Sequence, residues 1–128
     1  MAARQSVAEF KGVGSSSSTA QFALIDIPIP SIDGLSYATA GVSIMYTVTA
    51  NAGGSGVQTI VLVTAGALVS GALTMSPVSS VVSVGAAVIS AYAESVTGGN
   101  TARLSITPAV TAATSYLVHA EVQLYDPT

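Results

Sequence analysis

Residues 116–125, YLVHAEVQLY, alternate strictly between two sets of side chains. The first set is apolar and holds Tyr116, Val118, Ala120, Val122 and Leu124, and the second holds Leu117, His119, Glu121, Gln123 and Tyr125. Successive side chains of a β-strand point to opposite faces, whereas a helix repeats every 3.6 residues. The stretch therefore predicts a strand with one buried face and one mostly polar face.

Similar short patterns recur along the chain with turn residues between them. They are residues 21–29, 42–50, 57–63, 68–75, 78–84, 87–93 and 102–107, and the closing strand is 116–125. Val, Ile and Thr number 17, 8 and 13 among the 128 residues, and these β-branched side chains suit a pleated surface. We therefore predict an all-β fold, an antiparallel β-sandwich or jelly roll of about eight short strands. A helix within residues 65–91, which are rich in Ala, is the main alternative.

The amino-terminal segment differs from the rest of the chain. Residues 1–20 include a run of four serines and a threonine, and they show no clear periodicity. We predict a flexible, extended arm here, followed by a single β-sandwich domain over residues 21–128. If such an arm gains order by lying on a neighbour, Arg4, Phe10 and Lys11 are its candidate contact residues.

The chain carries very little charge. Asp, Glu, Lys and Arg make up 7% of it, against about 25% in an average soluble domain, and none lies between residues 34 and 93. The uncharged stretches 60–75 and 78–93 are shorter than the roughly 20 residues that span a bilayer, and both contain Gly and Ser, so no membrane association is expected. Two explanations remain open, a surface coated with Ser and Thr and a surface covered by other copies or by a partner.

Composition also argues against several kinds of site. The protein has no Cys, which excludes disulfides and thiolate ligands, and its net charge of −3 provides no basic stripe for nucleic acid. His119 is the single histidine, and with Glu121 it supplies too few ligands for a closed zinc site. No Gly-x-Ser-x-Gly motif surrounds any serine. We therefore expect no catalytic residues, no metal and no cofactor, and a protein that is not an enzyme.

The polar face of the closing strand is the best candidate contact surface. His119, Glu121, Gln123 and Tyr125 form a dense polar and aromatic group in a chain that has few such residues. Tyr46 and Tyr116 fall on apolar faces and are expected in the core, with each hydroxyl reaching a partner. We interpret the four-residue group as a contact surface for another protein rather than as an active site.

In overall style the chain resembles the decoration, or cement, proteins of tailed bacteriophage capsids. The resemblance is to a small Cys-free β domain with an amino-terminal arm, Ala, Ser, Thr and Val in its strands, and few charges. It implies a structural virion protein, made in the host cytoplasm, that forms homotrimers on the outside of the major capsid protein shell and stabilises it. A carbohydrate-binding or host-adhesion module, a phage tail or fibre subunit, and a small hydrolase that uses His119 are the alternatives.

Overall fold

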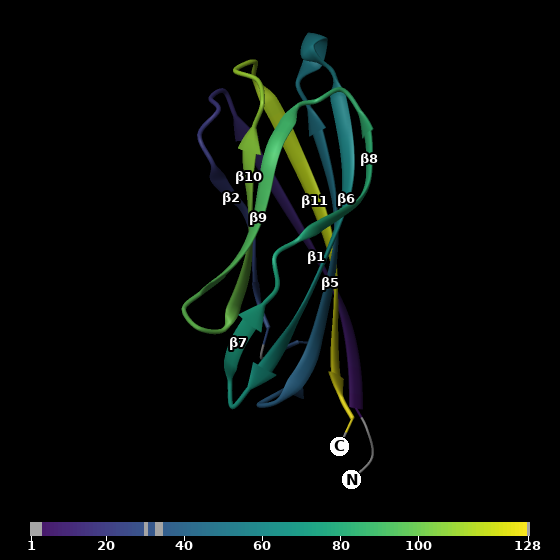
Figure 1. Cartoon of the computed structure of the whole chain (residues 1–128), viewed down its shortest axis with the longest axis vertical. Coiled ribbons are helices and arrows are strands. Elements are labelled where there is room, and N and C mark those ends of the chain that lie inside the picture. Colours follow the sequence, from purple (N-terminus) through teal and green to yellow (C-terminus); the bar gives the residue numbers. More distant parts are fainter. Residues whose placement is uncertain (1–3, 30, 33–34, 128) are drawn as a thin grey trace.

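The computed structural model describes residues 4–29, 31–32 and 35–127, and 74% of these residues lie in strands. All strand pairings are antiparallel, and the strands form two layers packed face to face (Figure 1). The predicted all-β sandwich is therefore confirmed.

The larger layer is a six-stranded sheet of long strands. Its members are β1 (Arg4–Ser16), β11 (Thr114–Asp126), β5 (Ala40–Asn51), β6 (Val57–Val69), β7 (Ala72–Met75) and β8 (Ser79–Gly85). The order is β1-β11-β5-β6, and β7 and β8 pair with different parts of β6. The strand on which the fold prediction was based, β11, thus lies inside the sheet and is paired along both edges.

The smaller layer contains three strands in the order β2-β10-β9: β2 (Phe22–Pro28), β10 (Thr101–Pro108) and β9 (Ile89–Thr97). Pro28 lacks an amide hydrogen, and it ends β2 at the edge of this sheet. Two further two-residue strands, β3 (Ser31–Ile32) and β4 (Leu35–Ser36), pair with each other as a separate ribbon.

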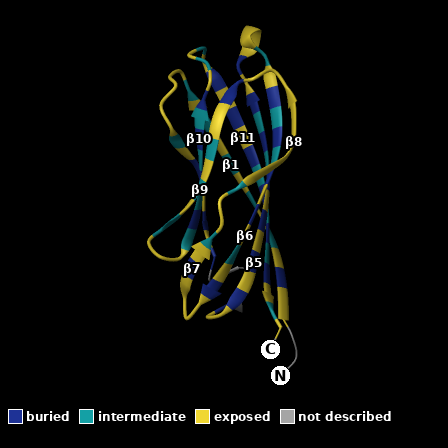
Figure 2. Ribbon diagram, in the orientation of Figure 1, coloured by how far each residue is buried: buried dark blue, intermediate teal, exposed yellow. Residues whose placement is uncertain are grey.

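The core lies between the two layers and is built from the alternation that the sequence shows. All five apolar residues of the first set in β11 are buried, and so are Ile44, Tyr46 and Val48 of β5. Leu104 and Ile106 of β10 close the core from the smaller sheet. Figure 2 shows the resulting pattern of buried and exposed bands along the strands.

The prediction of a flexible amino-terminal arm is wrong for residues 4–16. They form β1, which pairs with β11 without a break from Arg4 opposite Asp126 to Ser16 opposite Thr114. Its inward side holds mostly small residues, because β2 passes close to it: a Cβ atom at Gly12 would lie 3.1 Å from the carbonyl oxygen of Leu24. Small residues give a weak hydrophobic pattern, which is why the strand was missed. Residues 1–3 of the predicted arm lie outside the described part.

The middle of the chain also differs from the prediction in detail. The strand predicted at residues 57–63 continues to Val69, and the one predicted at 87–93 continues to Thr97. No helix forms within residues 65–91, and the one helical turn of the described residues is the 3-10 turn Gly53–Ser55. No helix in the described residues is long and apolar enough to cross a membrane.

A buried glutamine ties β6 to the segment that crosses between the layers. The side-chain oxygen of Gln58 accepts hydrogen bonds from the backbone amides of Val88 and Ile89, both at 2.9 Å, and its amide nitrogen donates to the Ser83 hydroxyl at 3.0 Å. The polar side chain of Gln58 thus has hydrogen-bond partners at both of its polar atoms, although the residue is buried, with 7% of its surface exposed.

Candidate interaction surface

The outward side of the six-stranded sheet is a continuous surface that we call the outer face. We define it by the outward-pointing residues of its four long strands and β8. These are Gln5, Val7, Glu9, Lys11, Val13 and Ser15 of β1; Ser115, Leu117, His119, Glu121, Gln123 and Tyr125 of β11; Gly41, Ser43, Met45, Thr47, Thr49 and Asn51 of β5; Val57, Thr59, Val61, Val63, Ala65, Ala67 and Val69 of β6; and Val82 and Val84 of β8.

The four residues predicted as a contact surface all lie on this face. His119, Glu121 and Gln123 are half-buried and Tyr125 is exposed. The amide of Gln123 donates to Glu121 at 3.3 Å, so the polar side chains along β11 interact with one another. Strand alternation placed these residues together, and the structure adds their neighbours on β1 and β5.

Two charged residues of β1 join that group. Lys11 is the register partner of His119, and Glu9 is the register partner of Glu121. The Nε2 atom of His119 lies 3.5 Å from a carboxylate oxygen of Glu9. Lys11, predicted as a contact of a separate arm, therefore belongs to the same face as the predicted contact residues of β11.

The other two predicted arm contacts serve the chain itself. Phe10 lies on the inward side of β1 and packs against the core. The guanidinium of Arg4 lies 4.5 Å from the ring centroid of Tyr37 and 3.4 Å from a carboxylate oxygen of Asp126. The Tyr37 hydroxyl in turn forms a 2.7 Å hydrogen bond with Ser6. Arg4 and Phe10 thus hold β1 in place.

The outer face also gathers the exposed apolar side chains. Every large apolar residue that is exposed in the described part of the chain, except Val81, belongs to it: Val7, Val13, Met45, Val57, Val63, Val69, Val82, Val84, Leu117 and Tyr125. Its four Lys, His and Glu residues lie in two neighbouring rows on β1 and β11, and β5, β6 and β8 contribute none. The sequence of β6 gives no sign of this face, because apolar residues occupy both alternating sets of positions from Val57 to Val63.

The outward side of the smaller sheet has a different character. Its strands are shorter, and their outward residues include the small side chains Ala91, Ala93 and Ser95. Arg103 and Asp26 form a two-point ion pair across it, with nitrogen to oxygen distances of 2.8 and 3.0 Å. The hydrogen bond from Arg103 lowers the pKa of Asp26 below its usual value. A small, polar surface of this kind resembles ordinary solvated protein surface.

The titratable side chains are few and dispersed. Among the described residues, no group of three or more His, Asp or Glu side chains is close enough to hold a metal ion. Two titratable groups in the interior, Tyr46 and Glu94, are joined by a direct hydrogen bond between the layers. The phenol donates to both carboxylate oxygens, at 2.8 and 3.0 Å. Burial raises the pKa of Glu94 to about 7. The Tyr116 hydroxyl, also expected to reach a partner, has none among the described residues.

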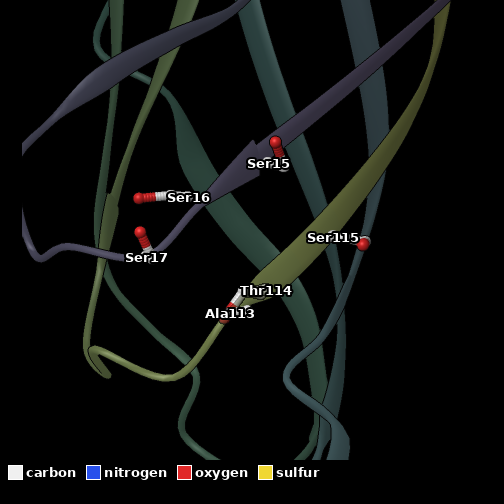
Figure 3. Close-up of a pocket in the computed structure, with 6 residues that line it drawn as sticks. All are labelled: Ser15, Ser16, Ser17, Ala113, Thr114 and Ser115. Carbon is white, nitrogen blue, oxygen red and sulfur yellow. The ribbon is translucent and has the colours of Figure 1, made fainter.

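A pocket of about 390 Å³ opens where β1 ends and β11 begins (Figure 3). It is lined by Ser15, Ser16, Ser17, Ala113, Thr114 and Ser115. The Ser16 and Thr114 hydroxyls already donate to nearby carbonyl oxygens, of Ser18 and Ala112. Since no titratable side chain lines the pocket, it offers no acid, base or metal ligand.

No family model and no curated protein matches the chain. Two solved structures are similar to it, both tailspike proteins of Acinetobacter phages. The tailspike of Acinetobacter baumannii phage AM24 matches with a TM-score of 0.55 and 7% identity, over 98% of this chain and 26% of that one. The tailspike of phage vB_ApiP_P1 matches with a TM-score of 0.43 and 14% identity, over 95% and 22%. The first match shows a shared fold, and the chain spans about a quarter of the length of that protein.

Proposed function

We propose that this chain is a structural, non-catalytic module of a phage particle, in a tailspike or tail fibre. The outer face is the observation that carries the proposal. Ten large apolar side chains are exposed on it, and exposed apolar side chains that gather on one face mark sites of protein contact. With 7% charged residues, the chain is suited to a surface that is partly covered by other subunits rather than fully exposed to solvent.

The shared fold supports the choice of a tail structure. Nearly the whole chain superposes on a segment of one tailspike protein, although 7% identity carries no residue-level correspondence. The assignment of this chain to a phage tail is therefore inferred from its fold and from its outer face, and the experiment below tests it.

Capsid decoration, which the resemblance implies, is the second candidate. The observation that favours it is β8, whose residues Ser79–Gly85 are all exposed and uncharged. A Ser-rich and Val-rich strand of this kind suits close contact with a shell of major capsid protein, because no ion has to lose its hydration. On this alternative the chain is a trimer bound to the outside of the capsid.

Immunogold electron microscopy distinguishes these locations. Antibodies raised against the folded chain are applied to particles purified from the phage or prophage that encodes it. Label at the tail end is the expected result, and label over the head transfers the chain to the capsid-decoration role. Particles that contain no copy of the chain, by labelling and by mass spectrometry, would refute both.

Adhesion to glycans is testable on the same protein. Sugar-binding surfaces commonly present aromatic rings, and Tyr125 is the one exposed aromatic side chain of the described residues. A glycan array is expected to show no binding. Binding that Tyr125→Ala abolishes would instead make the chain an adhesion module.

A further inference from the structure

We propose that the outer face binds the outer face of a second copy of this chain. The two copies are related by a two-fold axis that lies between the two outer faces, parallel to them and perpendicular to the strands. The axis passes between the row that contains Lys11 and His119 and the row that contains Glu9 and Glu121. This inference goes beyond the role in a particle, because it concerns the association of the isolated chain.

The size of the face matches the size of a stable interface. Strands β1, β11 and β6 have 13 residues and β5 has 12. At a rise of about 3.4 Å per residue and a spacing of about 4.8 Å, four such strands cover on the order of 800 Å². Each partner in a standard protein interface contributes about that area. A second copy supplies an equal area of the same chemistry.

The charges on the face are complementary to themselves. Within one chain, Lys11 of β1 lies opposite His119 of β11. Glu9 lies opposite Glu121, at a distance of two residues from the first pair on each strand. Rotation by half a turn about the proposed axis exchanges the two rows. It brings Lys11 over Glu9 of the second copy and His119 over Glu121 of the second copy, and the symmetry repeats both contacts. Lys11 has no ion-pair partner among the described residues, so it is available for this contact.

Two pairs of valines obey the same symmetry. On β1, Val7 and Val13 lie at equal distances on either side of the axis, so each meets the other in the second copy. On β6, Val61 and Val63 flank the axis in the same way, since they continue the two charged rows across β5. Valines thus meet valines on β1 and β6, and acids meet bases on β1 and β11, whereas Leu117 and Met45 come over polar residues of the second copy. The strands of the two copies have nearly the same axis direction, which is the aligned mode of sheet packing.

The occupant is therefore a second copy rather than an unrelated partner or a glycan. Rotation about the axis pairs bases with acids and the valines of β1 and β6 with valines, and this self-complementarity favours a second copy over an unrelated partner. Sugar-binding surfaces commonly present several exposed aromatic rings, and the outer face has one, Tyr125.

The test is the mass of the purified full chain in solution, measured by light scattering after gel filtration and by analytical ultracentrifugation from 1 to 100 µM. A species of about twice the 12.6 kDa chain mass is expected. A monomer throughout this range would overturn the proposal. A trimer that the substitutions below dissociate would keep the face as the contact but overturn the two-fold arrangement.

Substitutions separate this contact from others. Val63→Lys introduces an uncompensated charge beside the axis, and it is expected to weaken association at least tenfold. Ala93→Lys, on the exposed side of the smaller sheet, is the matched control and should leave the mass unchanged. Far-ultraviolet circular dichroism and a cooperative melt verify that each variant folds. Equal association of Val63→Lys and the parent chain would refute the contact.

A charge exchange tests the axis itself. Lys11→Glu places carboxylates against Glu9 of the second copy and should weaken association at least tenfold. The double variant Lys11→Glu/Glu9→Lys restores opposite charges across the axis, so it is expected to recover most of the lost affinity. If the double variant associates no better than the single one, the two rows do not face each other.

Discussion

The phenol of Tyr46, on β5, donates to both carboxylate oxygens of Glu94, on β9, and so joins the two layers of the sandwich by a side-chain hydrogen bond. Tyr46 is fully buried and Glu94 is partly buried, in a chain with very few charged residues. Desolvation raises the pKa of both groups, and in Glu94 it outweighs the stabilising bond from the phenol. The pair makes the folded state sensitive to pH in a predictable direction.

Stability should fall as the pH rises from about 4.5 to above 7. The pKa of Glu94 is about 7 in the folded chain against 4.5 for the free side chain, so folding favours the protonated carboxyl group. This stabilisation is complete below pH 4.5 and is lost as the pH rises through 7. After allowance for partial exposure, it amounts to about 2 kcal/mol. Urea unfolding between pH 4.5 and 8.5 measures it.

Two variants control that experiment. Glu94→Gln cannot ionise, so its free energy of unfolding should vary less over the same pH range than that of the parent chain. Tyr46→Phe removes the donor to the carboxylate and should destabilise more at pH 8.5 than at pH 4.5. Asp26, whose pKa is lowered, contributes only to loss of stability at still lower pH. A parent profile that rises with pH from 4.5 would contradict the assignment.

Gln58→Leu should destabilise the fold by about 2 kcal/mol or more. The change keeps a similar volume but leaves the buried amides of Val88 and Ile89 without their acceptor, and each unsatisfied group costs about 1–3 kcal/mol. Gln21→Leu, in an exposed loop position, is the matched control and should change stability little. Similar thermal midpoints for the two variants would show that the Gln58 contacts contribute nothing net.

Gly12→Ala should lower stability, whereas Gly41→Ala should not. A Cβ atom at Gly12 would lie 3.0 Å from a methyl carbon of Val118 and 3.1 Å from the Leu24 carbonyl oxygen, so β1 and β2 must move apart. Overpacking of this kind costs about 1–3 kcal/mol. At Gly41 the nearest atom is 3.6 Å away, which is ordinary contact. Denaturant melts of both variants test the close approach, and equal stability would argue against it.

Deletion of residues 116–128 should prevent folding. Strand β11 pairs with β1 and β5 and supplies buried side chains from Tyr116 to Leu124, so its loss divides the larger sheet and opens the core. Circular dichroism and a thermal melt of the truncated chain provide the measurement. A truncated protein that melts cooperatively would show that the remaining strands fold without β11.

The prediction of the fold succeeded where side chains alternate clearly and failed where they do not. In β11 the contrast between apolar and polar residues is large, so the strand, its buried face and its outward residues could all be inferred. In β1 the inward positions 12 and 14 hold glycine, because residues of β2 lie against them, and the sequence contains no mark of that neighbour. The strand was therefore interpreted as an arm.

The sequence alone determined that this is an all-β protein poor in charge, because both properties follow from local periodicity and composition. Only the tertiary structure decided which strands adjoin. Pairing of β1 with β11 places Lys11 beside His119 and Glu9 beside Glu121, although more than a hundred residues separate the partners along the chain. Likewise, Val63 and Met45 become neighbours through strand register. Register between distant strands depends on the packing of the whole sandwich, and for that reason the outer face has no signature in any single stretch of the sequence.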